Sequence, residues 1–291
     1  MFSGWDEYCL INNELARLVR NLPESDLRTV IGYILSAPGK RVRPLILIFS
    51  AEAFGGTAGQ AMNAALAIEL VHAASLAHDD ILDCGEERRG QPSVQQRFGP
   101  EAALLAGDYL ISRSIDLISH YHQPVIRAFA AACMSMAEGE MLDLSRRSAP
   151  EDYYQCISRK TASLFAASAR IGGVISTAPE SDVARLESYG HHLGIAYQVL
   201  DDLEEYLGVD QGKSSRKASL TLPRIYGNDS LSPDETAGAM CIKVIEDQSM
   251  AAIEALAGFT GAPEMKARLK SIVDEMTLRG LGRCRSQKSR S

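Results

Sequence analysis

The sequence predicts an all-α fold in a single domain over residues 1–291, and three observations support that prediction. Apolar residues recur mostly at spacings of three and four, and the alternation of a half-buried strand is rare. Prolines, glycines and capping residues divide the chain into pieces of helical length. No linker rich in proline, glycine and serine separates these pieces, and no internal repeat stands out. With 46% hydrophobic residues in a chain of 291, a large core can be buried.

Four helices are expected in the first half of the chain. Each has a recognisable start or stop, such as a proline in its first turn or a glycine pair after its last. The expected ranges are residues 44–56, which close at Gly55 and Gly56, residues 61–83, residues 101–118, and a helix from Pro124 onward.

Two further helices follow in the second half. The first opens with the proline and acidic residues of 149–152 and stops at the glycine pair 172–173. The second runs to about residue 207 and has Ser181 or Asp182 as its expected cap.

The last expected helix opens at residues 232–235, Ser-Pro-Asp-Glu. These four residues supply a cap, a proline at the first helical position and acids in the first turn. Residues from about 280 to 291 are polar and basic, which predicts a flexible tail.

Charge and cysteine content exclude several classes of protein. A net charge of −7 argues against a nucleic-acid binder, because phosphate binding needs a basic field. The six cysteines contain no CxxC pair, which is typical of reduced thiols rather than a disulfide framework. The acidic N-terminus lacks the order of a signal peptide, and the apolar run PLILIF is far shorter than the ~20 residues of a membrane span. We therefore expect a soluble, cytoplasmic protein without a transmembrane segment.

A dense group of charges stands at residues 75–90, SLAHDDILDCGEERRG. Asp79 and Asp83 are four residues apart, so their carboxylates share one face of a helix, with Asp80 beside them. Like charges at this spacing repel each other, and arginines or divalent cations could offset that cost. Hard oxygen ligands in this pattern suit Mg²⁺, which binds through one or two carboxylates together with substrate phosphate. A lone cluster of this kind would more often be a solvated helix end.

A second cluster makes the metal interpretation stronger. Residues 198–205 read QVLDDLEE, so that Asp201, Asp202 and Glu205 repeat the same spacing after another apolar run. The two clusters lie far apart in the chain and must therefore belong to different helices. If folding brings them face to face, they form a binding site for a metal-bound diphosphate.

Cations that could complete such a site are spread along the chain. Residues 38–44, PGKRVRP, place basic side chains just before a helix, where they oppose the helix dipole but can form an anion cradle with backbone N–H groups. Taken singly, each basic residue is as well explained as a surface cation. The full set is Lys40, Arg41, Arg43, Arg88, Arg89, Lys160 and Lys213.

With these motifs in order, the chain resembles the trans-isoprenyl diphosphate synthases, the polyprenyl synthase family. The resemblance runs from about residue 38 to about residue 227 and rests on GKRVRP, ELVHAASLAHDDILDCGEERRGQPS, LLAGDYL, SRKTASLFAAS, and GIAYQVLDDLEEYLG through GKSSRKASLTLP. It implies an all-α bundle around a central cavity, usually a homodimer. It also implies the joining of isopentenyl diphosphate to an allylic diphosphate, dependent on Mg²⁺.

The resemblance assigns a role to each group of residues. The implied Mg²⁺ ligands are Asp79, Asp80, Asp83, Asp201, Asp202 and Glu205. The residues implied to grip the allylic diphosphate are Arg88, Lys160, Thr161, Gln198 and Lys213. The implied pocket for isopentenyl diphosphate contains Lys40, Arg43, His72 and Arg89. Without the motif, His72 on an apolar helix would be read as a satisfied core histidine.

Two departures from the family pattern stand out. Glu205 occupies a position where aspartate is usual, and the loop after Lys213 is shorter than is common. That loop lacks an expected aspartate, and Ser219 stands where a second lysine is frequent, a role for which Lys217 is the available substitute. These changes leave open that the chain is one subunit of a heteromeric synthase.

Small residues next to the first cluster predict a long product. Ala74 and Ser75 lie one turn before Asp79, where an aromatic ring would block chain growth by its volume. Their size predicts a product of geranylgeranyl length or longer, with Val71, Ile68 and Tyr109 as candidates for the floor of the cavity. A class I terpene cyclase is the less favoured alternative, because it needs neither GKRVRP nor a second acidic cluster of this form.

Overall fold

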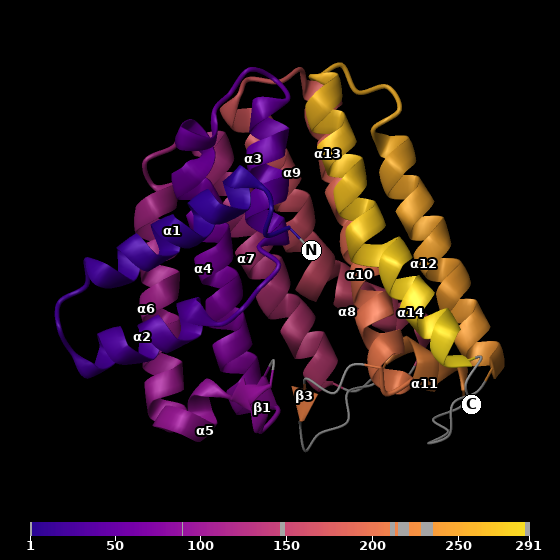
Figure 1. The fold of residues 1–291 in the computed structure, drawn as a ribbon, viewed down its shortest axis with the longest axis horizontal. Helices are drawn as coiled ribbons and strands as arrows, with labels where there is room; N and C mark the ends of the chain where they lie inside the picture. The colour runs from indigo at the N-terminus through magenta and orange to yellow at the C-terminus, as the bar shows by residue number, and fades with distance from the viewer. Residues whose placement is uncertain are drawn as a thin grey trace.

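The computed structural model describes residues 2–88, 90–145, 149–209, 213–214, 221–227 and 235–288, and of residues 213, 214, 235 and 285–288 only the backbone. Helices dominate these residues, as predicted (Figure 1). The elements are α1 (Asp6–Arg20), α2 (Asp26–Ser36), α3 (Val42–Glu52), α4 (Ala58–Leu82), α5 (Val94–Phe98), α6 (Pro100–Ile118), α7 (Gln123–Leu144), α8 (Pro150–Ile157), a π-helical segment η1 (Ser158–Ala162), α9 (Ser163–Ile175), α10 (Glu180–Tyr206), α11 (Leu222–Tyr226), α12 (Glu235–Ala255), α13 (Pro263–Val273), a second π-helical segment η2 (Asp274–Leu278) and α14 (Arg279–Lys288).

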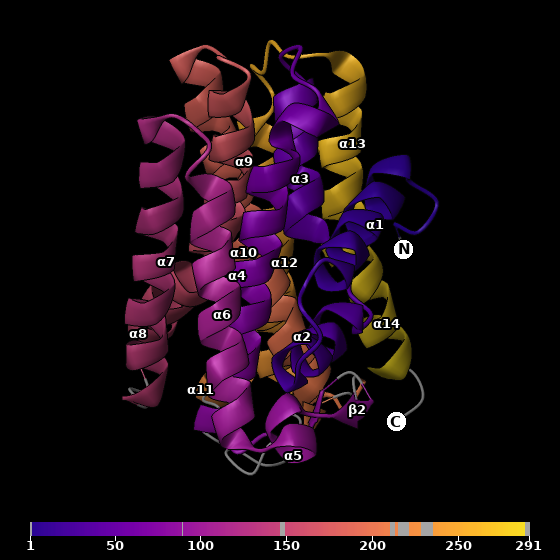
Figure 2. The ribbon, with the colours of Figure 1, turned by 90° about the vertical axis from the view of Figure 1, so that its left-hand side faces the viewer.

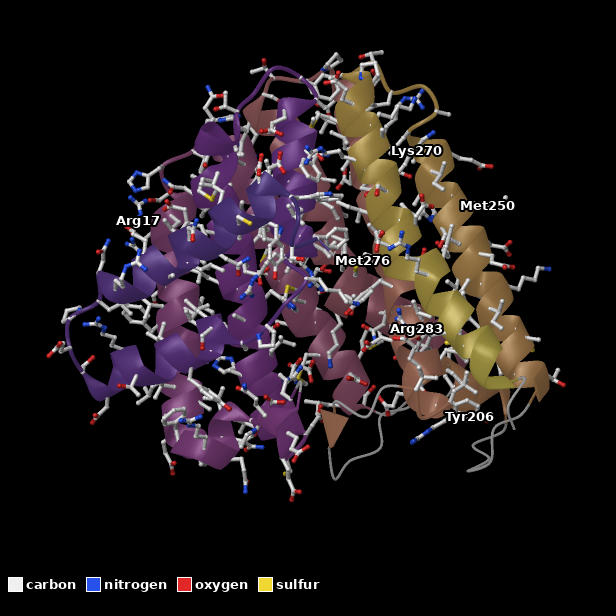
Figure 3. All side chains as sticks on the ribbon, in the orientation of Figure 1. Arg17, Tyr206, Met250, Lys270, Met276 and Arg283 are labelled. Carbon is white, nitrogen blue, oxygen red and sulfur yellow. The ribbon has the colours of Figure 1, made fainter. Side chains whose placement is uncertain are left out.

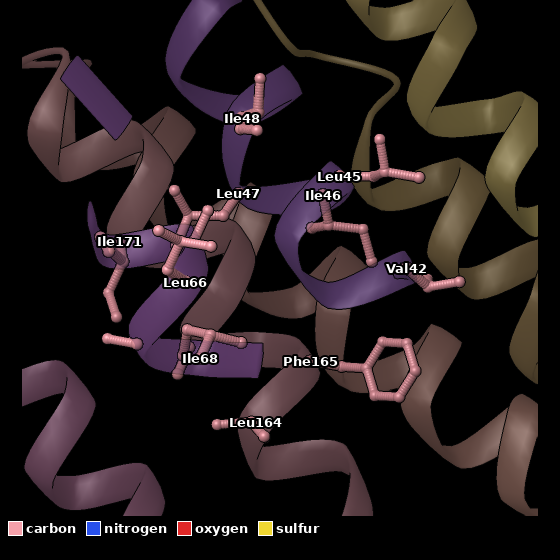
Figure 4. Packing of buried hydrophobic residues seen from close by; sticks show 14 of the residues in the cluster. Val42, Leu45, Ile46, Leu47, Ile48, Leu66, Ile68, Leu164, Phe165 and Ile171 are labelled. Atoms are coloured by element: carbon pink, nitrogen blue, oxygen red, sulfur yellow. The ribbon is translucent and has the colours of Figure 1, made fainter. Parts of the chain in front are cut away.

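The long helices run side by side along the bundle, and the shorter α1 and α2 lie across one face (Figures 1 and 2). Helix α3 packs against α4 and α9, and α10 packs against α9 and α12. Residues 45–49 of α3 are fully buried, since neighbours surround this helix (Figure 4). No described helix is both long enough and apolar enough to cross a bilayer.

Three two-residue strands form a small sheet at the lower end of Figure 1. They are β1 (Glu87–Arg88), β2 (Gln91–Pro92) and β3 (Lys213–Ser214), in the order β2-β1-β3. Both pairings are antiparallel, and Arg88 stands opposite Lys213. The sheet therefore connects the segment after α4 with the segment after α10, at the end of the bundle where both helices finish.

Most predicted helices are present, with shifted ends. Thr57 and Gln60 form a capping box, so α4 begins at Ala58, three residues earlier than expected. The glycine pair 172–173 does not end its helix, which continues to Ile175. A Cβ at Gly172 would collide with the carbonyl oxygen of Leu47, so this glycine permits close packing of α9 on α3.

The expected cap of α10 is wrong. The helix begins at Glu180 after Pro179, and neither Ser181 nor Asp182 caps it. Asp182 is buried within the first turn instead, where it accepts hydrogen bonds from the backbone N–H (3.1 Å) and the hydroxyl (2.6 Å) of Thr260. Of the expected start at residues 232–235, only Glu235, the first residue of α12, lies among the described residues.

The flexible tail expected from about residue 280 is also corrected. Residues 279–288 form α14, in which Leu281 and Cys284 are buried. Arg283 pairs with Glu204 of α10 at 2.5 Å, at the end of the bundle where α10 finishes (Figure 3). The two buried side chains give this basic segment an apolar face, and the ion pair adds a second attachment. Residues 289–291 lie outside the described part of the chain.

Candidate active site

A cavity of about 1680 Å³ lies between α4, α7, η1 and α10. Both acidic clusters line it, which confirms the expectation that folding brings them to one hollow. The lining residues include Asp79, Asp80 and Asp83 from the first cluster and Asp201, Asp202 and Glu205 from the second. The first cluster occupies the last turn of α4 and the residue directly after it, and the second lies within the last two turns of α10. Because the negative end of a helix dipole disfavours carboxylates, both positions favour a bound cation.

In the first cluster, Asp80 points inward and is nearly inaccessible. The Nε and Nη2 groups of Arg88 donate hydrogen bonds of 2.7–3.0 Å to both of its carboxylate oxygens. Gln95 of α5 donates to the carbonyl oxygens of Asp80 and Gly85. These two bonds hold both ends of the segment that contains Arg88, residues 83–93, against the end of α4. Asp80 is therefore already neutralised by the protein.

Asp79, next to it, is not neutralised in this way. Burial raises the pKa of Asp79 to about 7, and the neighbouring Glu140 and Asp83 add to the rise. Lys160 and Arg88 oppose it without cancelling it. A carboxylate in this state would gain from an additional cation, because its charged form is poorly compensated.

In the second cluster, Asp202 is the buried member. The hydroxyl of Tyr153 donates to one of its oxygens at 2.6 Å, and the amide of Gln198 donates to the other at 2.9 Å. Thr161 in turn donates to the amide oxygen of Gln198 at 2.9 Å. Burial nevertheless raises the pKa of Asp202 to about 7, and Asp201 and Glu205 contribute to the rise.

Besides Arg88, the cavity lining includes the predicted cationic side chains of Lys160, Lys40 and Arg43. Lys160 in η1 is 2.5 Å from Glu140 and 2.6 Å from Asp143, two residues that sequence reasoning missed. Lys40 lies 5.3 Å from the centroid of the Tyr197 ring, and Arg43 lies over a second aromatic ring. The predicted His72 of α4 also faces this space.

Arg41, between those two cations, turns away from them. It is buried and pairs with Glu69 at 2.6 Å, and it donates to the carbonyl oxygens of Leu35 and Ala37. Its backbone is left-handed, with φ of 51°. Arg41 thus anchors the turn at the start of α3, where Lys40 and Arg43 face a helix N-terminus that favours anions.

The remaining predicted residues are described only in part. The backbone of Lys213 pairs with that of Arg88, which brings the segments after the two acidic clusters together. Arg89, Lys217 and Ser219 lie outside the described residues, so the predictions for them remain predictions.

The prediction for Ala74 is wrong in its geometry, whereas Ser75 lines the cavity. The side chain of Ala74 is fully buried in the core on the other face of α4. Val71 also lines the cavity, but Ile68 and Tyr109 do not. Sequence reasoning missed the deeper apolar lining, which comes from Ile111, Cys133, Met136 and Leu164 on three other helices.

The donor set fits hard cations that are shared with a substrate. Among the described residues, no three Asp, Glu, His or Cys side chains are gathered closely enough to hold a metal ion alone. The poorly compensated Asp79 and the matching cluster on α10 supply carboxylate oxygens, and phosphate oxygens can complete the shell of Mg²⁺.

Comparison with known proteins agrees with this geometry. A family model described as polyprenyl synthetase matches residues 24–258. A geranylfarnesyl diphosphate synthase of Methanosarcina mazei is 41% identical over 277 residues, which cover 94% of this chain and 93% of that protein.

Solved structures agree as well. The crystal structure of a geranyltranstransferase from Methanosarcina mazei has a TM-score of 0.83 at 40% identity and covers 97% of this chain and 100% of its own. A polyprenyl synthase from Caulobacter crescentus, in complex with calcium and isoprenyl diphosphate, has a TM-score of 0.79 at 27% identity and covers 91% and 93%.

Proposed function

This chain belongs to the polyprenyl synthetase family and elongates prenyl diphosphates, and we propose that its cavity joins isopentenyl diphosphate to an allylic diphosphate with the help of Mg²⁺. One observation carries the proposal: both acidic clusters line a single cavity that cationic side chains complete. At about 1680 Å³, the cavity exceeds the ~300–1,000 Å³ of an ordinary ligand pocket and has room for two diphosphates.

We assign the metal-facing positions to the outer members of each cluster, Asp79, Asp83, Asp201 and Glu205. Asp80 and Asp202 already have protein partners, which narrows their expected role to holding the cluster in place. When bound, Mg²⁺ supplies positive charge to the diphosphate leaving group. The related Caulobacter structure, with its calcium and isoprenyl diphosphate, supports this assignment.

We divide the other polar residues into two groups, one for each diphosphate. Arg88, Lys160, Thr161, Gln198 and Lys213 serve the allylic diphosphate, because they adjoin the acidic clusters. Lys40, Arg43, His72 and Arg89 serve isopentenyl diphosphate, since Lys40 and Arg43 stand at the N-terminus of α3.

The reaction follows from this arrangement. The allylic C–O bond breaks, and its electron pair leaves with the pyrophosphate, which Arg88 and Lys160 stabilise. The double bond of isopentenyl diphosphate then attacks the allylic cation and forms the new C–C bond. A proton leaves the adjacent carbon for the released pyrophosphate, which restores a double bond. The apolar walls exclude water that would otherwise trap the cation.

The product is geranylgeranyl diphosphate or longer in this proposal. Ser75 leaves space beside α4, and the deeper lining is aliphatic or sulfur-containing rather than aromatic at Ile111, Cys133 and Met136. The name of the geranylfarnesyl relative supports a product in this range.

The proposed assembly is a homodimer through α7. This helix lies at the edge of the bundle in Figure 2 and exposes the apolar side chains of Ala130, Ala131 and Met134, while its exposed Ala137, Met141 and Leu144 also line the cavity. Exposed apolar faces of this kind mark protein interfaces. All six cysteines are free, which supports the proposed cytoplasmic location.

Incubation of the purified protein with isopentenyl diphosphate and an allylic diphosphate, with and without Mg²⁺, tests the proposal. We expect a longer prenyl diphosphate only when Mg²⁺ is present. A hydrocarbon product would indicate a terpene cyclase, and activity only after addition of a second polypeptide would indicate a subunit of a heteromeric synthase. The chain length of the product decides the proposed length.

A further inference from the structure

Lys160 occupies an unusual position in the helix that contains it. It lies in η1, a π-helical segment between α8 and α9, and such segments often occur at functional sites. Helix α7 approaches η1 closely here, because a Cβ at Gly139 would collide with the backbone nitrogen of Lys160. The glycine therefore brings the residues that follow it on α7 beside the lysine.

Two carboxylates from α7 hold the ammonium group of Lys160. Its Nζ lies 2.5 Å from an oxygen of Glu140 and 2.6 Å from an oxygen of Asp143. The side chain of Glu140 is only 16% exposed, and both acids line the cavity rather than the outer surface. They are therefore not an ordinary solvated ion pair.

The two carboxylates do not use all the N–H donors of the Lys160 ammonium group. A lysine ammonium has three N–H donors; one of them donates to Asp143 at 2.6 Å, and Glu140 is in ion-pair contact with the same Nζ. Burial by itself would lower the pKa of Lys160, whereas the negative charge of Asp79 raises it. The contacts with Asp143 and Glu140 leave Nζ with a further donor, in a cavity that the first acidic cluster also lines.

We propose that Glu140 and Asp143 are positioning residues that direct the third N–H of Lys160 toward the allylic diphosphate. This inference rests on the proposed function of the site. The four-carbon stem of a lysine has many rotamers, and two fixed acceptors select the one that reaches the substrate. The pair also adds negative charge near the diphosphate, so its benefit comes from geometry and not from attraction.

The chain offers a matched control for this pair. Glu138, one residue before Gly139, pairs with Arg159 at 2.9 Å, one residue before Lys160. This ion pair joins the same two segments, but its side chains are 62% and 46% exposed. The variant Glu138→Gln removes a bond between α7 and η1 without touching Lys160.

The experiment compares steady-state kinetics of Asp143→Asn, Glu140→Gln and Glu138→Gln in the full-length protein, with the allylic diphosphate and isopentenyl diphosphate varied separately. We expect Asp143→Asn and Glu140→Gln each to raise the KM for the allylic diphosphate by about tenfold, equivalent to about 1.4 kcal/mol, with the KM for isopentenyl diphosphate within about twofold. Glu138→Gln should leave both values unchanged. Thermal unfolding of each variant checks that the fold is retained.

A double-mutant cycle separates positioning from other effects. In a Lys160→Met background, Asp143→Asn should have no further effect on the KM for the allylic diphosphate, because its action passes through the lysine. An unchanged or lower KM in Asp143→Asn and Glu140→Gln alone would overturn the inference, since removal of two negative charges would then only relieve repulsion.

Two other outcomes also decide the matter. A large rise in the Mg²⁺ concentration for half-maximal activity in Asp143→Asn would identify the acids as metal ligands and overturn the inference. If the unaltered protein forms no longer prenyl diphosphate at all, the proposed function fails, and that result is separate from any difference between variants.

Discussion

The two acidic clusters have the same spacing, but the protein treats their buried members differently. In the first, Asp80 meets a charged partner, and Arg88 binds both of its oxygens. In the second, the donors to Asp202 among the described residues are the neutral Tyr153 and Gln198, and burial raises its pKa to about 7. The inner carboxylate is charge-balanced at α4 and only hydrogen-bonded at α10.

In each cluster we call the buried middle aspartate, Asp80 or Asp202, the anchor, and we call the first and last members the working face. The middle aspartate of each cluster is buried and held by the protein, whereas the first and last members are more accessible. The anchors fix the orientation of the last helical turn, and the accessible members remain able to bind a cation. The second cluster should depend more on that cation, because its anchor has no positive partner in the part of the chain that the structure describes.

Loss of an accessible member should have the largest effect. We expect Asp79→Asn or Asp201→Asn to lower kcat/KM by on the order of 10³-fold, because a ligand for the charge on the leaving group is lost. Steady-state assays check this, with the exposed Asp247→Asn on α12 as a control. Activity within tenfold of the unaltered protein would remove the distinction between anchors and working face.

The next largest effect is expected at Asp80, the anchor that has a charged partner. Arg88→Met leaves the buried Asp80 without its partner, and we expect a loss of about 3 kcal/mol in the free energy of unfolding. Urea unfolding measures this value. Arg97→Met, on the neighbouring α5, is the comparison variant, since its guanidinium stacks on aromatic rings without a buried carboxylate partner among the described contacts.

The neutral anchor should give a smaller change. Tyr153→Phe removes one donor from Asp202 but leaves Gln198, and we expect a loss of about 2 kcal/mol. The same unfolding experiment, in metal-free buffer, tests it. A loss as large as that of Arg88→Met, or larger, would contradict the weaker dependence of Asp202 on its neutral partner.

One turn before the first acidic cluster, Ser75 of α4 faces the cavity and its neighbour Ala74 faces the core. We expect substitutions there to give the smallest change in rate. Ser75→Phe should shorten the product by at least one isoprene unit while kcat changes by only a few fold, because the ring would enter the cavity. Ala74→Phe should instead overpack the core and cost about 1–3 kcal/mol of stability. Product chromatography and unfolding distinguish the two. A shorter product from Ala74→Phe alone would reverse the assignment.

The sequence predicted much of this arrangement because helical spacing determines which residues share a face. It placed both acidic triads correctly on helices, and the ordered motifs placed Lys160 and Gln198 near them. Spacing could not show which aspartate of each triad turns inward. That outcome depends on Arg88 and Tyr153, which reach the aspartates only after folding.

The errors have equally local causes. Ala74 and Ser75 are neighbours, yet one helical step of about 100° separates core from cavity. Two acids three residues apart in the largely apolar α7, Glu140 and Asp143, were the available signal for the contact with Lys160. The apolar Leu281 and Cys284, also three apart, were the signal that residues near 280 form a packed helix.

The small sheet has a thermodynamic consequence. Because β1 is its middle strand, the segment that bears Arg88 shares backbone pairing with β3, which comes from the other side of the cavity. A ligand whose binding orders β1 would therefore be coupled to a ligand whose binding orders β3, and the coupling free energy would be the same in both directions.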